Sequence, residues 1–274
     1  MSVKQESGGR RSVQVEIEVP GTPADVWQAI ATGPGISSWL VPAEFEQSDG
    51  KPVALTLDFG PGMKSRSTVT AWDPPRMFVK QSKGWMPGSP PMMDEWSVEP
   101  RTADTCLFRI VHSLVADTDQ WDHQLTAAEG GWPAFLQTLR IYLAHFRGLH
   151  STTMKWMSNV AGTEAEAWDA LLTKSGLKGL SVGQTWTSPA GLPEHRGLVE
   201  YLTHSPCDAL VRLVQPGPGI AAFGAFNFGG QSMVAMNFYL YGDQAPATVA
   251  REMPQWEAWI QQNFSLPPES AAND

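Results

Sequence analysis

The sequence predicts an α+β protein of two tandem domains, each a curved antiparallel β-sheet around a long C-terminal helix. Three observations support this fold class: an internal repeat, strand-like alternation of apolar residues, and an apolar helical stripe near the end of each copy. We expect the first domain at residues 12–150 and a second, shorter and divergent domain at residues 152–265.

The repeat starts with the end of a strand and a short helix. Residues 19–30 read VPGTPADVWQAI, and residues 160–171 read VAGTEAEAWDAL. In each copy a threonine stands three positions before an acidic residue, which predicts a capping box at the start of the helix. The residues concerned are Thr22 and Asp25 in the first copy, and Thr163 and Glu166 in the second.

Two further matches follow in the same order. Residues 68–81 and 198–213 each read as a strand, a proline-containing turn and a second strand, and we align Phe78 with Leu210. Trp132-Pro133 and Met253-Pro254 each begin an apolar stripe at helical spacing, so a long helix is expected from about residue 132 to 147 and another from residue 253. Three matches in one order predict a tandem duplication. The stripes are formed by Phe135, Leu139, Leu143 and Phe146, and by Trp256, Ile260 and Phe264.

Composition excludes several classes of partner. The net charge is -9, without a cluster of basic residues, so we expect no binding to nucleic acid or to anionic membranes. No apolar run approaches the length of a membrane-spanning helix, and the first residues do not form a secretion signal. Cys106 and Cys207 form no disulfide or zinc pattern. We therefore expect a cytoplasmic protein with buried thiols, no metal and no cofactor.

The N-terminal copy resembles a known family. Its segments TPADVWQAI…SSWLVP (22–42), TVTAWDPPRMFV (68–79), EWSVEP (95–100), FRIVHS (108–113) and GGWPAFLQTLRIYL (130–143) are similar to the SRPBCC superfamily, also called START-like or helix-grip proteins. Within it, they look like the branch named for the activator of the heat-shock-protein ATPase. The resemblance implies the helix-grip fold. It also implies binding of a hydrophobic ligand, cyclisation of polyketides, or association with chaperones.

Candidate ligand-binding residues of the first copy are aromatic and apolar, with one histidine. Alternation along residues 105–114 places Cys106, Phe108, Ile110, His112 and Leu114 on one face and Arg109 on the other. His112 is the candidate for acid–base chemistry or for orienting the polar end of a ligand, although a structural histidine is also consistent with the pattern. The candidate lining is Trp39, Trp85, Trp96, Phe108, His112, Trp132, Phe135 and Leu139.

The second copy has an analogous apolar set, for which a closed core is the alternative. Its candidate members are Phe226, Phe228, Met236, Phe238 and Trp256. A separate group of polar residues (Asp117, Asp119, Asp122 and His123) lies in an acidic segment, which we expect to be a solvated loop rather than a metal site.

Three functions compete at this level. The first is binding of a hydrophobic small molecule between the sheet and the C-terminal helix. The second is an enzyme of the polyketide cyclase or aromatase type, with His112 as its candidate catalytic residue and Tyr201 and His204 as further candidates. The third is a chaperone-associated protein-interaction module with an unidentified partner. The sequence names no ligand and leaves enzymatic activity open.

Overall fold

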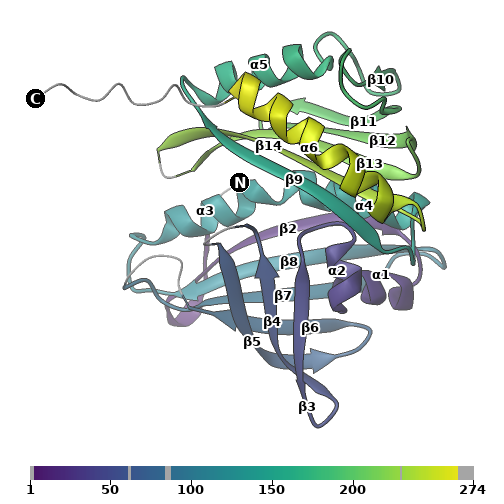
Figure 1. Cartoon of the computed structure of the whole chain (residues 1–274). Coiled ribbons are helices and arrows are strands. Elements are labelled where there is room, and N and C mark those ends of the chain that lie inside the picture. The colour runs from purple at the N-terminus through teal and green to yellow at the C-terminus, as the bar shows by residue number, and fades with distance from the viewer. Residues whose placement is uncertain (1–2, 61–62, 84–87, 229, 265–274) are drawn as a thin grey trace, which may run out of the picture. The chain divides into compact units, whose positions relative to one another are not determined.

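The computed structural model describes residues 3–60, 63–83, 88–228 and 230–264. The chain divides into two compact units, Met1–His150 and Ser151–Asp274. Each unit has one antiparallel sheet with helices on it, which confirms the predicted α+β fold (Figure 1). Within the described part of the chain, no helix has the length and apolar character needed to cross a membrane.

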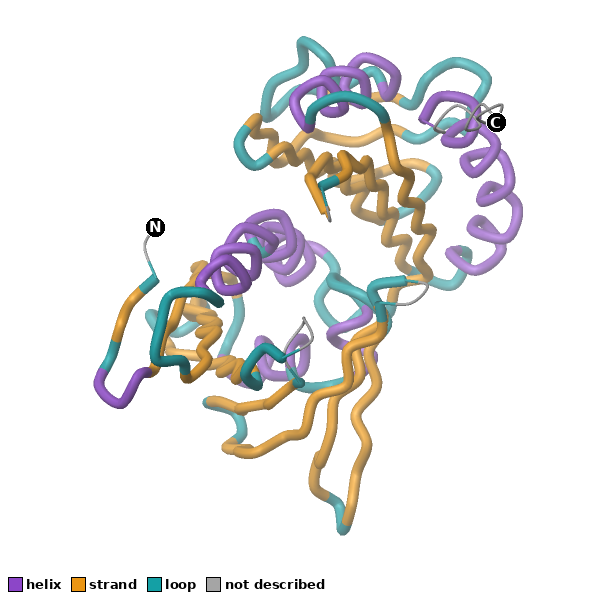
Figure 2. The backbone as a smooth tube through the Cα atoms, turned by 90° about the vertical axis from the view of Figure 1, so that its left-hand side faces the viewer, coloured by secondary structure: helices purple, strands orange, loops and turns teal. Residues whose placement is uncertain are grey.

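The first unit has an eight-stranded sheet in the order β1-β2-β8-β7-β6-β5-β4-β3. Its strands curve around the helices α3 and α4, and α4 contacts β2 (Figure 2). The strands are Lys4–Gln5, Arg10–Pro20, Ala43–Ser48, Lys51–Asp58, Lys64–Asp73, Met77–Ser82, Met92–Pro100 and Thr105–Val115 (β1 to β8). The helices are α1 (Pro23–Ile30), α2 (Gly33–Ser37), α3 (Asp122–Gly131) and α4 (Pro133–His145), with a 3₁₀ turn at Ser7–Gly9.

The second unit has a six-stranded sheet in the order β10-β11-β12-β13-β14-β9. Its long helix α6 contacts β9 and β14, and the shorter helix α5 contacts β12, β13 and β14. The strands are Ser151–Val160, Thr185–Thr187, Arg196–His204, Cys207–Gln215, Gly219–Phe228 and Gln231–Tyr241 (β9 to β14). The helices are α5 (Glu164–Ser175) and α6 (Ala245–Phe264).

The two sheets correspond strand by strand, as the repeat predicts. The order β2-β8-β7-β6-β5-β4 in the first unit matches β9-β14-β13-β12-β11-β10 in the second. Both units also have a register shift at the same place in the β5–β6 and β11–β12 pairs, directly after Val69 and after Val199. Residues of these strands in the first sheet can therefore be matched to their counterparts in the second sheet by following the strand pairing.

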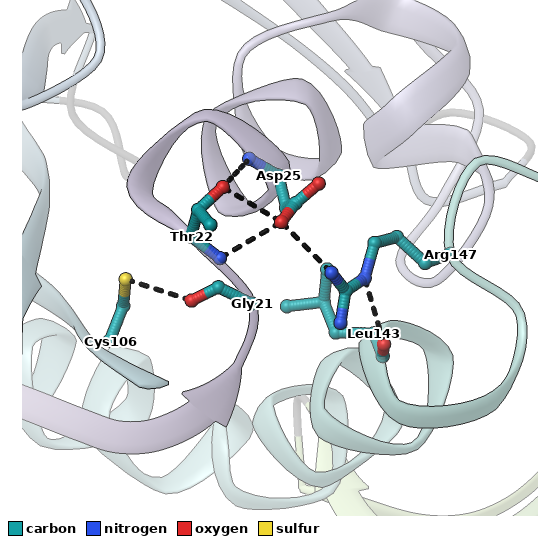
Figure 3. Close-up of polar contacts among 6 residues, drawn as sticks. All are labelled: Gly21, Thr22, Asp25, Cys106, Leu143 and Arg147. Atoms are coloured by element: carbon teal, nitrogen blue, oxygen red, sulfur yellow. Dashed lines mark hydrogen bonds and ion pairs between the residues drawn. The ribbon is translucent and has the colours of Figure 1, made fainter. Parts of the chain in front are cut away.

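The helix starts are built as the sequence predicts. Thr22 Oγ1 accepts a hydrogen bond from the Asp25 amide at 3.3 Å, and Thr163 Oγ1 accepts one from the Glu166 amide at 3.3 Å. In both copies the acidic side chain accepts a hydrogen bond from the threonine amide, which completes the capping box. The Asp25 carboxylate also pairs with Arg147 at 2.9 Å, so the start of α1 is tied to the end of α4 (Figure 3).

One expectation about the first unit is wrong in detail. The acidic segment with Asp117, Asp119, Asp122 and His123 is not wholly a loop, because α3 begins at Asp122, whose carboxylate binds the Arg11 guanidinium through two contacts of 2.5 Å. The helix expected from about residue 132 to 147 is confirmed as α4, and Trp132 separates it from α3.

In the second unit, α6 begins at Ala245, well before the expected start at residue 253, and continues through Pro254. The counterpart of Phe78 is Ala209, since Trp72 pairs with Phe78 and Leu202 pairs with Ala209. The alignment with Leu210 was one residue out, and such a slip moves a side chain to the other face of the sheet.

The capping box at Thr163 yields a first prediction. Removing its hydroxyl in Thr163→Ala costs about 1 kcal/mol of local stability, because the Glu166 amide loses its acceptor. Hydrogen exchange of the first-turn amides of α5, followed by mass spectrometry, should accelerate about fivefold. Thr163→Ser keeps the hydroxyl and should exchange like the wild type. Equal exchange in Thr163→Ala would show that the cap contributes nothing.

Candidate functional site in the first unit

The inner face of the first sheet carries a row of ionisable side chains. In the ladders Lys80 lies opposite Asp94, and Asp94 lies opposite His112, on the neighbouring strands β6, β7 and β8. All three residues are buried, with exposed fractions of 5%, 5% and 4%. The burial of Cys106, Phe108, Ile110, His112 and Leu114 confirms that His112 lies on the inward face of β8.

These three side chains form one hydrogen-bonded chain. The Lys80 ammonium binds Oδ2 of Asp94, and Nδ1 of His112 lies 2.6 Å from Oδ1 of the same carboxylate. Burial opposes ionisation of Asp94, but the charge of the Lys80 ammonium and the hydrogen bonds from Lys80 and His112 outweigh this effect and hold the pKa of Asp94 well below its usual range. A buried carboxylate is therefore kept ionised between two partners.

Trp132 completes the chain and determines the tautomer of His112. Its Nε1 donates to Nε2 of His112 at 2.5 Å, and the two ring planes differ by 24°. Because an indole nitrogen can only donate, Nε2 of His112 must be the accepting, unprotonated nitrogen. The proton of the neutral ring is then on Nδ1, from which it is donated to Asp94. His112 thus directs a basic lone pair towards the half-buried ring of Trp132.

The remaining lining residues fall into two groups. Trp39, Trp96, Phe108 and Leu139 are all 0% exposed, so they are closely packed side chains rather than the wall of an open cavity. Trp132 and Phe135 are half-buried, and their rings lie 6.2 Å apart. Trp85 lies outside the described residues.

The indole nitrogens of the buried tryptophans differ in their partners. Nε1 of Trp39 donates to the carbonyl oxygen of Ala29 at 2.9 Å. Nε1 of Trp96 is buried and has no hydrogen-bond partner among the described residues. The Trp96 ring lies 5.6 Å from that of Trp132, and the Lys80 ammonium lies 6.0 Å from the Trp96 ring centre. The Trp96 ring, whose N–H has no acceptor in the described part of the chain, therefore lies beside the hydrogen-bonded residues Lys80, Asp94 and His112.

The second unit repeats the site without its charges. Lys80, Asp94 and His112 correspond through the ladders to Val211, Ala221 and Phe238. The next residues along the same ladder positions also correspond. Val69 lies opposite Lys80 and Val13 opposite His112 in the first unit, and Val199 lies opposite Val211 and Met154 opposite Phe238 in the second. All three replacements are 0% exposed. The sheet of the second unit therefore packs well with apolar side chains where the first unit has Lys80, Asp94 and His112.

Three of the five candidates in the second unit lie inside, and two do not. Met236, Phe238 and Trp256 are buried, and the Phe238 and Trp256 rings meet at 4.8 Å. Phe226 and Phe228 do not belong to this face, because the buried alternate residues of β13 have odd numbers, and Phe228 is 62% exposed. Phe223 takes the inward place instead, 5.7 Å from Phe238.

A different histidine is buried in the second unit. His195, 0% exposed, lies 5.3 Å from the Phe238 ring, and its Nε2 is 2.7 Å from Oε2 of Glu252 on α6. Arg251 donates to the other carboxylate oxygen of Glu252 at 2.6 Å. Burial lowers the pKa of His195, and the bond to Glu252 opposes this shift.

Pockets in the structure lie away from the predicted lining. One of about 600 Å³ in the second unit opens beside Glu194, Arg251 and Glu252. Another of about 210 Å³ in the first unit lies beside Met93 and Val115. Neither includes a predicted ligand-binding residue. Of the further candidates, Tyr201 and His204 lie on β11, and Nδ1 of His204 accepts from Trp168 at 3.1 Å.

Sequence reasoning missed Lys80, Asp94 and His195. The first two could have been found by alternation, since Asp94 stands two residues before the inward Trp96 and Lys80 stands two residues after Phe78. His195 precedes its strand directly and shows no comparable periodic signal.

Comparison with known proteins finds a sequence similarity in the first unit. Residues 10–139 match the model of the family described as polyketide cyclase / dehydrase and lipid transport. The N-terminal part of the chain is therefore similar in sequence to this cyclase/lipid-transport family. The match covers β2 to β8 and includes Lys80, Asp94, His112 and Trp132. A search of curated proteins found no match.

Solved structures similar to the chain include both two-domain and one-domain proteins. The di-domain ARO/CYC BexL from the BE-7585A biosynthetic pathway is 12% identical, with 94% of this chain and 100% of that chain covered and a TM-score of 0.46. The Aha1 dimer from Colwellia psychrerythraea is 24% identical, with 50% and 98% covered and a TM-score of 0.37. DynU16, a putative protein in the dynemicin biosynthetic locus, is 16% identical, with 91% and 96% covered and a TM-score of 0.40.

The apolar row of the second unit suggests a substitution experiment on the first. Asp94→Ala alone leaves the Lys80 ammonium buried without its partner, and should cost about 3–5 kcal/mol in free energy of unfolding. The triple variant Lys80→Val/Asp94→Ala/His112→Phe copies the second unit, and should recover most of that loss because no charge remains buried. Urea titrations monitored by circular dichroism compare the variants. A triple variant less stable than Asp94→Ala would contradict this account.

Proposed function

We propose that the first unit binds a hydrophobic small molecule on the inner face of its sheet, beside the start of α4. The observation that carries this proposal is the buried Lys80–Asp94–His112 chain. Charges removed from water cost several kcal/mol each before pairing compensates for them. The second unit folds with Val211, Ala221 and Phe238 in their place, so the fold itself does not require the charges.

The place of entry follows from burial. Trp39, Trp96 and Phe108 are fully buried, whereas Trp132 and Phe135 are partly accessible. A ligand therefore reaches the polar chain most directly past Trp132, with its apolar part against these aromatic rings. The match to a family described by cyclisation and lipid transport supports an apolar ligand. The narrower relationship to the heat-shock-ATPase activator branch, and a chaperone partner, stay predictions.

Native mass spectrometry of gently purified protein tests the proposal, together with thermal shift against a panel of bicyclic and long-chain apolar compounds. The wild type should carry a small molecule or be stabilised by members of the panel. The Lys80→Val/Asp94→Ala/His112→Phe variant should bind the same compounds at least about tenfold more weakly, because the polar end of the ligand loses its partners. A bare wild type that no compound stabilises would overturn the proposal.

Catalysis is the second candidate, and the tautomer of His112 favours it. Nε2 of His112 is an unprotonated base, and Asp94 both positions the ring and stabilises the imidazolium that forms on proton uptake. The proton comes from an acidic C–H or O–H of the substrate and returns to the product from Nε2.

Turnover of a co-purified or panel compound can be followed by mass spectrometry. His112→Phe should abolish product formation, while an apolar analogue without a hydrogen-bond donor should bind within about threefold of its wild-type affinity, because it makes no hydrogen bond to the base. Asp94→Asn should keep the ring in place yet lower the rate about 100-fold or more and alter the pH profile. Full turnover by His112→Phe would exclude a base role for His112.

A further inference from the structure

The hydrogen bonds of His112 also specify the chemistry of the ligand. We propose that Trp132 is a gate whose indole N–H occupies the place of a ligand group, and that this group is a hydrogen-bond donor such as a phenolic or enolic hydroxyl on a bicyclic-sized apolar body. This inference rests on the proposed binding function of the first unit, which it deepens by naming the ligand class.

The donor requirement comes from the fixed tautomer. Asp94 is an ionised carboxylate that accepts a hydrogen bond from Nδ1–H, so Nε2 of the neutral His112 ring has only a lone pair to offer. In the closed structure the indole N–H of Trp132 satisfies this lone pair at 2.5 Å. A ligand carbonyl or ether oxygen cannot replace Trp132 there, because two acceptors would face one another without a proton between them.

The ability of Trp132 to move follows from its surroundings. It is half-buried and lies in the break between α3 and α4, without a side-chain cap on the second helix. Gly130 and Gly131 precede it, and a Cβ on either would meet nothing within 4 Å. Sterics therefore do not require glycine here, while its backbone freedom lowers the cost of reorienting this segment.

The size of the ligand group follows from the space that Trp132 leaves. Its ring contacts those of Trp96 and Phe135 at 5.6 and 6.2 Å, so the vacated volume is that of a flat bicyclic ring between aromatic walls. A hydroxyl also accepts hydrogen bonds, which suits the unpartnered Nε1 of Trp96 in the adjoining ring.

A matched pair of probes tests the donor requirement. 2-Naphthol and 2-methoxynaphthalene have the same ring system, but only the naphthol can donate. Isothermal titration calorimetry should show that the wild type prefers the naphthol by about tenfold, the size of one hydrogen bond to a buried partner. Trp132→Ala opens the gate permanently and should bind 2-naphthol at least about tenfold more tightly than the wild type does.

His112→Phe in the Trp132→Ala background should abolish the preference between the probes while keeping affinity for both rings. Circular dichroism establishes that each variant is folded. Trp132→Phe, which keeps a smaller aromatic ring and removes the N–H, serves as the milder version and should also bind the naphthol more tightly.

The outcomes separate the two proposals. Equal affinity for both probes in the wild type and in Trp132→Ala would overturn the donor and gate inference and leave hydrophobic binding intact. A preference for the naphthol that persists after His112→Phe would also overturn it, because another acceptor would then be responsible. No binding of either probe to the wild type or to the opened variants would overturn the inference and count against the proposed function itself.

Discussion

The buried carboxylate of Asp94 is the constraint on which the site depends. It has the Lys80 ammonium on one oxygen and His112 on the other, in the middle of an otherwise apolar face. Removing Lys80 would leave the Asp94 charge without compensation in a region of low dielectric constant. Through this one group, side chains from three neighbouring strands are joined, and Nε2 of His112 is left free to accept from Trp132.

The two units share one strand order, so the second unit acts as an internal control for the first. At the same ladder positions the second unit has Val211, Ala221 and Phe238, and its core is closed. The polar row is thus separable from the fold, which makes a stability argument for it weak and a functional argument strong. The second unit instead buries His195 against Glu252, from different elements. The two units therefore share an architecture and differ in where each places its ionisable groups.

The break between α3 and α4 explains how the closely packed first unit could admit the proposed ligand. The aromatic core of the first unit has no exposed surface at Trp39, Trp96 or Phe108, so binding requires a side chain to move. Trp132 stands between two helices, whereas α6 of the second unit is continuous over the corresponding region. A break in the helix beside the polar row is present only in the unit that has that row.

The sequence by itself determined the repeat, the two capping boxes and the inward face of β8, because these depend on local spacing: three residues across a helix start, two along a strand. It did not show that Asp94 and Lys80 meet His112. That contact depends on which strands are neighbours and in what register, and a shift of one residue would turn Asp94 to the other face. Only the tertiary structure could therefore show that His112 shares the Asp94 carboxylate with Lys80 and accepts a hydrogen bond from Trp132.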